Sequence, residues 1–169
     1  PVIGMISRLY DNKGMDLIEK SFDELMNLNI HLVILGTGDK KYHKFFSNMG
    51  SKYHNKFSCY IGFDDELAHL IEAGSDMFLM PSKFEPCGLN QMYSLMYGTV
   101  PIVRKTGGLA DTVQKFNSKT KTGNGFVFEK YSAKEMVTEI KNAIKIFTSD
   151  KETWQTIMRN GMKSDFSWL

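Results

Sequence analysis

The fold is decided by the stretch "DMFLMPSKFEPCGLNQMYSLMYGTVPIVR", residues 76–104. An apolar run, Asp76–Met80, is followed by a segment with helical spacing, Leu89–Tyr97, and then by a second apolar run, Val100–Arg104. Two prolines and a glycine lie within residues 81–88 and mark a loop between the first strand and the helix. This order predicts two parallel strands joined by a crossover helix.

The same alternation of short apolar runs and longer amphipathic segments continues along the chain. Most of the runs are apolar on both faces, as the central strands of a parallel sheet are. We therefore predict an α/β fold, a Rossmann-like three-layer parallel sheet with helices on both faces. The polar, basic segment Lys115–Asn124 is interpreted as a solvated loop. The further strands are predicted at Val2–Ser7, His31–Leu35, Phe57–Ile61 and Gly125–Phe128, and the further helices at Gly14–Asn27, Lys40–Gly50, Asp65–Gly74, Leu109–Phe116, Ala133–Phe147 and Lys151–Lys163.

Length and composition limit the classes of function. The 169 residues suffice for one domain, so we predict a single domain over residues 1–169. A net charge of +2 is smaller than the basic excess typical of nucleic-acid binders, and no apolar run approaches the length of a membrane span. We therefore expect neither nucleic acid nor membrane as a partner. Because Pro1 leads directly into a predicted strand, we expect a fragment of a longer protein.

The cysteines and histidines indicate neither disulfides nor a metal site. Cys59 and Cys87 belong to no CxxC pair, and no signal-peptide pattern is present, so we expect a reducing, cytoplasmic location. Free cysteines are mostly buried, and Cys87 is interpreted as a packing residue. The four histidines lack the spacing of metal ligands, so we expect no metal.

In an open α/β sheet, ligands bind at the carboxyl ends of the strands, so the segments after the strands are the candidate sites. Arg8 and Lys13 follow the first strand and could grip a diphosphate, although two surface cations are the simpler explanation of this segment alone. Gly36 and Gly38 follow the second strand; they allow close approach of a ligand, and a tight turn explains them equally well. The dinucleotide fingerprint needs a third glycine at position 41, where Lys41 stands.

Three later segments should lie at the same carboxyl edge of the predicted sheet. Phe63 could stack on a base, but an aromatic residue filling the core is the favoured interpretation. Glu85 should face the ligand crevice, and the amide groups of residues 88–90 should point at an anion. Thr106 and Gly107 offer further amides before a helix. Together the segments predict a pocket for a nucleotide diphosphate, with one carboxylate near the group that is transferred.

At these residues the chain closely resembles bacterial glycogen synthases and plant starch synthases, which are retaining glycosyltransferases built from two Rossmann-like domains in the GT-B arrangement. The resemblance covers almost the whole chain and implies the second, nucleotide-binding domain. It rests on "SKFEPCGLNQMYSLMYGTVPIV", "TGGLADTV", "SRLYDNKGMDL", "LVILGTGD", "IGFDDELAHLIEAGSDMFLMPS", "GNGFVFE" and "DFSW".

The resemblance implies a hexosyltransferase that passes glucose from ADP-glucose to the non-reducing end of an α-1,4-glucan, with retention and without a metal or other cofactor. The acceptor would be held through an absent N-terminal domain, so the isolated chain should be inactive. Arg8 and Lys13 would grip the donor diphosphate, and Glu85 would lie at the donor sugar. Gly88, Leu89 and Asn90 would meet the distal phosphate, Phe63 would lie against adenine, and Gly36 and Gly38 would form the turn beside the nucleotide. Tyr93, Thr106 and Gly107 complete the expected substrate-binding set.

Tyr93 discriminates among relatives. Many other retaining GT-B enzymes carry a second glutamate eight positions after the first, and glycogen and starch synthases lack it, as this chain does. Two alternatives stay open: a GT-B enzyme that uses a UDP or GDP sugar, and a non-catalytic Rossmann-like nucleotide-binding module.

Overall fold

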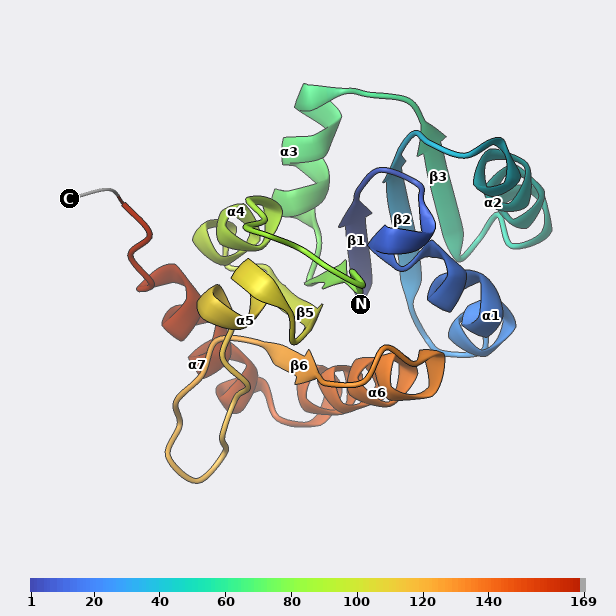
Figure 1. Cartoon of the computed structure of the whole chain (residues 1–169). Coiled ribbons are helices and arrows are strands. Elements are labelled where there is room, and N and C mark those ends of the chain that lie inside the picture. Colours follow the sequence, from blue (N-terminus) through green and yellow to red (C-terminus); the bar gives the residue numbers. More distant parts are fainter. Residues whose placement is uncertain (168–169) are drawn as a thin grey trace.

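The computed structural model describes residues 1–167, in which six parallel strands form one sheet between two layers of helices (Figure 1). The strands are β1 (Val2–Ile6), β2 (His31–Gly36), β3 (Phe57–Ile61), β4 (Met77–Met80), β5 (Val100–Arg104) and β6 (Phe126–Phe128). The helices are α1 (Met15–Met26), α2 (Lys40–Lys52), α3 (Asp65–Gly74), α4 (Asn90–Tyr97), α5 (Gly107–Thr112), α6 (Ala133–Ser149) and α7 (Lys151–Met162), and a short 3-10 turn, η1 (Asp11–Lys13), precedes α1.

The order of the strands, β3-β2-β1-β4-β5-β6, places β1 and β4 side by side at the centre of the sheet. From β1 the chain first adds strands on one side, and from β4 it adds them on the other. Loops that leave β1 and β4 therefore diverge and open a crevice at the carboxyl edge of the sheet, which is where ligands bind in this topology.

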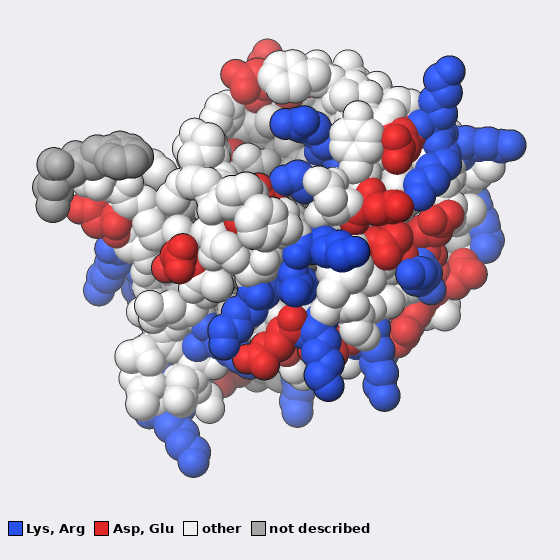
Figure 2. Space-filling model, in the orientation of Figure 1, with Lys and Arg blue, Asp and Glu red and all other residues white. Residues whose placement is uncertain are grey.

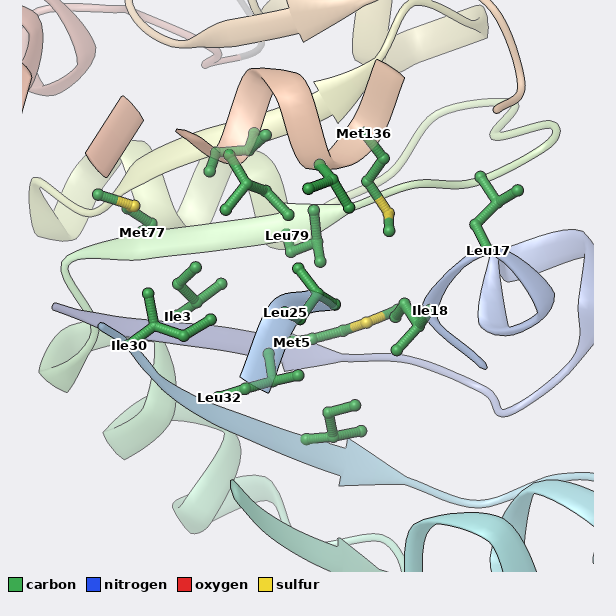
Figure 3. Packing of buried hydrophobic residues seen from close by; sticks show 14 of the residues in the cluster. Ile3, Met5, Leu17, Ile18, Leu25, Ile30, Leu32, Met77, Leu79 and Met136 are labelled. Carbon is green, nitrogen blue, oxygen red and sulfur yellow. The ribbon is translucent and has the colours of Figure 1, made fainter. Parts of the chain in front are cut away.

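The main core lies between the sheet and α1, α2 and α6. Figure 3 shows Met5 of β1 and Leu79 of β4 directed toward Ile18 of α1 and Met136 of α6. Successive residues of a strand face opposite sides, so Phe78 instead packs in a second cluster with α5 on the other face. Burial of each such side chain contributes about 1.5–3 kcal/mol, so the sheet is a rigid base for the loops at its edge.

The structure confirms the predicted fold class and all six strands, with shifts of one residue at several ends. The predicted helix Leu109–Phe116 is wrong in its bounds, because the helix runs from Gly107 to Thr112 and Val113 is extended. The reason is tertiary: the Gln114 amide donates to Asn124 Oδ1 (2.8 Å) and the Phe116 amide to the Gly125 carbonyl (2.9 Å). The chain there pairs with the segment that enters β6, which helical geometry forbids.

Residues 115–124 form the expected loop and are mostly exposed. Across residues 1–167, none of the helices combines the length and the apolar character that crossing a membrane requires. The end of the "DFSW" motif, Trp168, lies outside the described residues.

Candidate nucleotide-binding site

A cavity of about 160 Å³ lies at the carboxyl edge of the sheet, between the loops that follow β1 and β4. Figure 2 shows Lys and Arg side chains in the middle of the face that Figure 1 turns to the viewer, with Asp and Glu side chains between them. Six of the predicted site residues line this one cavity: Arg8, Lys13, Glu85, Gly88, Leu89 and Asn90. The fold therefore brings together the two cations, the carboxylate and the start of α4, as the sequence predicts.

Lys13 and Glu85 form an ion pair across the crevice. Lys13 Nζ lies 2.5 Å from Glu85 Oε2, and the Ser82 hydroxyl donates to the same oxygen at 3.2 Å. Glu85 is only 8% exposed. A carboxylate this buried needs a cation and a hydrogen-bond donor to remain charged. The pair therefore fixes a negative oxygen and a positive nitrogen at one point of the cavity wall.

The start of α4 supplies amide donors beside this pair. Gly88 has a φ of +75°, which L side chains rarely adopt, and the first bond of the helix turn runs from the Met92 amide to the Leu89 carbonyl (2.9 Å). The amides of residues 88–90 precede that bond and have no acceptor within the helix. The fully buried Gln91 holds this turn, because its Nε2 donates to the Cys87 and Gly88 carbonyls at 3.2 and 3.0 Å. Such a helix start attracts anions.

The loop that carries Arg8 and Lys13 is anchored from α2. Lys41 Nζ lies 2.8 Å from Asp11 Oδ1, and the Tyr42 hydroxyl donates to the same oxygen. The hydrogen bond from Lys41, followed by that from Tyr42, lowers the pKa of Asp11. The loop is also tied directly to the β4 loop, since the Lys83 amide donates to the Asn12 carbonyl at 2.9 Å.

The "TGG" segment supports the loop that carries Glu85. A Cβ on Gly107 would lie 2.1 Å from the Glu85 carbonyl oxygen, and one on Gly108 would lie 2.0 Å from the Cys87 carbonyl oxygen. The Gly108 amide also donates to the Glu85 carbonyl at 3.0 Å. Only glycine permits this approach. Thr106 stands at the N-cap position of the same helix, and contact of Thr106 and Gly107 with a substrate stays a prediction.

Gly36 and Gly38 have a similar role after β2. A Cβ on Gly36 would lie 1.8 Å from the Ser7 carbonyl oxygen, and one on Gly38 would lie 2.5 Å from that of Leu9. The two loops pair here, with the Leu9 amide donating to the Thr37 carbonyl at 2.9 Å. This close approach of the two loops requires glycine at both positions, and contact of Gly36 and Gly38 with a nucleotide stays a prediction.

A second cavity, of about 270 Å³, adjoins the first and shares Arg8 and Asn90 with it. Gly36 and Phe63 line this cavity. Phe63 is 89% exposed, so the favoured interpretation of this ring as a core residue is wrong. The exposed ring lines the same cavity as Arg8, as an aromatic platform for a ligand would.

Two other side chains differ from their expected surroundings. Cys87 is exposed, so its interpretation as a buried packing residue is wrong; Gln91 fills the space beneath this turn instead. Tyr93 lies outside both cavities, on the face of α4 that meets His69, with the two ring centroids 6.3 Å apart. Within residues 1–167, no group of three or more His, Cys, Asp or Glu side chains is arranged to hold a metal ion.

Two residues that the sequence analysis missed reach the loops of the site. Arg104 ends β5, and its Nη1 donates to the Lys83 carbonyl at 2.5 Å. Tyr131 follows β6, and its hydroxyl lies 2.8 Å from the Asp11 carbonyl oxygen. Burial, followed by the hydrogen bond to Asp16, raises the pKa of Tyr131, which keeps the hydroxyl protonated as a donor. The available signal was that Arg104 lies at the end of one strand and Tyr131 in the segment after another.

Comparison with known proteins matches the chain to a family of glycosyl transferases. Residues 1–161 match the family described as glycosyl transferases group 1. The chain is 54% identical over 168 residues to proteins named glycogen synthase from Pseudothermotoga lettingae and Desulforudis audaxviator, a match that covers 99% of the chain and 35% and 34% of those proteins. The chain thus spans about a third of the length of these curated relatives.

A solved structure has the same fold. The chain superposes with a TM-score of 0.90 on the catalytic domain of starch synthase IV from Arabidopsis thaliana, bound to ADP and acarbose. The two are 34% identical, and the match covers 99% of the chain and 35% of that structure.

Proposed function

The chain belongs to the glycosyl transferases group 1 family, and from this premise we propose that it is the donor-binding domain of an ADP-glucose-dependent glycogen or starch synthase. The two relatives at 54% identity support this proposal. Because the chain spans about a third of their length, the rest of the enzyme would supply the second domain of a GT-B fold and hold the glucan acceptor.

In this proposal the first cavity receives the diphosphate and the glucose of the donor. Arg8, Lys13 and the amides at the start of α4 surround the same space, and this convergence is the observation that carries the proposal. As the bond between glucose and ADP breaks, negative charge develops on the diphosphate. Cations and amides already in place stabilise that charge without reorganisation, and such stabilisation is often the largest contribution to catalysis.

Glu85 acts at the donor sugar in this scheme. Its ion pair with Lys13 holds the buried carboxylate in the wall of the cavity, next to one of the proposed phosphate-binding cations. A fixed negative charge at this position favours the positive charge that develops on the sugar ring during glycosyl transfer. Glucose then passes to the non-reducing end of the glucan with retention of configuration.

The second cavity would hold the nucleoside. Phe63 offers an exposed ring for adenine to stack on, and Arg8 lies between this cavity and the first, so one ligand can span both. The complex of the starch synthase IV relative with ADP supports the choice of adenine.

The test uses the full-length enzyme that carries this chain. We expect Arg8→Ala or Lys13→Ala to lower the turnover of ADP-glucose by about 100-fold or more, since loss of one charge-stabilising donor costs roughly 3–4 kcal/mol. Lys141→Ala and Arg159→Ala, on α6 and α7, remove the same charges away from the cavity and should leave turnover unchanged. Near-normal turnover in both site variants would overturn the diphosphate assignment.

Calorimetry with ADP and UDP separates the donor classes. Tighter binding of ADP supports the proposal, and tighter binding of UDP favours an enzyme that uses another nucleotide sugar. Saturable NAD binding that ADP does not affect would favour the non-catalytic Rossmann-like module.

A further inference from the structure

Arg104 connects the end of β5 to the loop that carries Glu85. Its Nη1 donates to the Ser82 and Lys83 carbonyls at 3.4 and 2.5 Å, and the Ser82 hydroxyl in turn donates to Glu85. Arg104 itself lies outside the lining of the cavity. It acts on the backbone of the loop two to three residues before Glu85.

Tyr131 makes the corresponding connection to the loop that carries Lys13. Its hydroxyl lies 2.8 Å from the Asp11 carbonyl oxygen and also contacts the Asp16 carboxylate. These two residues stand on either side of Lys13 in the chain, in η1 and in the first turn of α1. One phenol therefore grips both ends of the segment from which Lys13 projects.

The two side chains also contact each other. The Arg104 guanidinium carbon lies 5.6 Å from the centroid of the Tyr131 ring, within the range of a cation–π contact. The result is a continuous bridge from the β4 loop through Arg104 and Tyr131 to η1. Its two ends lie next to the two members of the ion pair.

Holding Arg104 in this position has an energetic cost. Arg104 Nε is buried and has no hydrogen-bond partner among residues 1–167, which is unfavourable for folding. The backbone hydrogen bond between Lys83 and Asn12 already joins the two loops. What the bridge adds is control of their relative orientation.

We propose that Arg104 and Tyr131 are positioning residues that set the separation and orientation of Lys13 and Glu85. The inference rests on the proposed function for its kinetic consequence, although the geometry stands by itself. A shift of about 1 Å in a reacting group lowers turnover by as much as about 100-fold, so even a small relaxation of this bridge should be measurable.

The key variant is Tyr131→Phe in the full-length enzyme, and Tyr53→Phe is its matched control. Both tyrosines are half-buried and donate to an aspartate of α1, but Tyr53 reaches Asp23 (2.5 Å), far along the helix from Lys13. We expect Tyr131→Phe to lower kcat about 10-fold and Tyr53→Phe to change it less than about 2-fold. Equal effects of the two variants would overturn the inference.

A second background separates positioning from simple destabilisation. In enzyme that already carries Lys13→Ala, Tyr131→Phe should lower kcat by less than about 2-fold, because the group that it positions is absent. If Tyr131→Phe still lowered kcat about 10-fold in the Lys13→Ala enzyme, Tyr131 would not act by positioning Lys13. Arg104→Met should lower kcat as Tyr131→Phe does, and Arg104→Lys, which keeps one charged donor, should restore part of the loss.

A crystal structure of the Tyr131→Phe variant gives a readout that does not depend on activity. We expect the separation of Lys13 Nζ and Glu85 Oε2 to increase from 2.5 Å to beyond about 4 Å, the limit of an ion pair. An unchanged ion pair would contradict the inference. Absence of glucosyl transfer in the wild-type enzyme would instead overturn the proposed function, and the structure of the variant would still decide this inference.

Discussion

Among single residues, Glu72 carries a buried carboxyl group that the proposed reaction does not use. It lies on α3 and is 2% exposed, and His69 Nδ1 lies 3.6 Å from its Oε2. Burial raises the pKa of Glu72 from its usual 4.5 to about 7; His69 opposes this shift and Asp65 adds to it. The carboxyl is therefore held more tightly protonated in the folded chain than in the unfolded chain.

This raised pKa fixes the sign of a pH effect. The stabilisation from the protonated carboxyl is fully present below pH 4.5 and is lost as the pH rises through about 7. We predict that Glu72→Gln, which stays neutral, raises the free energy of unfolding by about 2–3 kcal/mol more at pH 8 than at pH 5. Urea unfolding at the two pH values measures this, with the exposed Glu66→Gln on the same helix as control. A gain independent of pH would contradict the assignment.

At the residue scale, the sequence predicted the charged groups of the site and missed what holds them. Arg8 and Lys13 lie in the segment after β1 and Glu85 lies in the segment after β4, and the topology of a parallel sheet alone gathers such segments at one edge. Arg104 and Tyr131 were missed because their contacts are with backbone carbonyls of distant loops, which no sequence spacing encodes. The exposure of Phe63 likewise depends on its surroundings in three dimensions.

Among the elements, the loops after β1 and β2 depend on one close backbone contact. Gly36→Ala would place a Cβ 1.8 Å from the Ser7 carbonyl oxygen, where neither side is a flexible side chain. Gly50, inside α2, has no atom within 4 Å of an added Cβ, so Gly50→Ala is the matched control. We predict that Gly36→Ala lowers the free energy of unfolding by about 1–3 kcal/mol and that Gly50→Ala raises it by about 0.5–1 kcal/mol.

Urea unfolding of both variants checks this pair. If Gly36→Ala were as stable as the wild type, the two segments would have to separate without cost, and the contact with Ser7 would not be what requires glycine at position 36. Failure of Gly50→Ala to gain stability would mean that the position is not governed by helix propensity.

The elements themselves were predictable where local pattern and tertiary structure agree. Buried parallel strands are continuous apolar runs, so all six were found. The pattern failed at Val113 and Phe116, which repeat with helical spacing although the backbone there is extended. The Asn124 side chain accepts the Gln114 amide and the Gly125 carbonyl accepts the Phe116 amide, and the local sequence does not encode that competition.

On the scale of the whole molecule, one edge of the sheet collects the chemistry and the opposite surfaces supply rigidity. The site draws on the loops after β1, β2, β3 and β4 and is supported from β5 and β6. In the proposed function, every strand of the sheet thus contributes to placing one ligand. In our proposal this chain does not supply the contacts to the glucan acceptor, because the rest of the longer enzyme would provide them.

This division predicts how the chain behaves by itself. The 169-residue chain should bind ADP through Arg8, Lys13 and the start of α4, and it should synthesise no glucan from ADP-glucose. Calorimetry should show that Lys13→Ala weakens ADP binding about 10-fold or more, because charged hydrogen bonds contribute about 1.5–3 kcal/mol, whereas Lys141→Ala should leave it unchanged. Glucan synthesis by the chain alone would mean that the acceptor also binds here and that a second domain is not needed. If Lys13→Ala bound ADP as tightly as Lys141→Ala does, the diphosphate would instead lie elsewhere on the edge of the sheet.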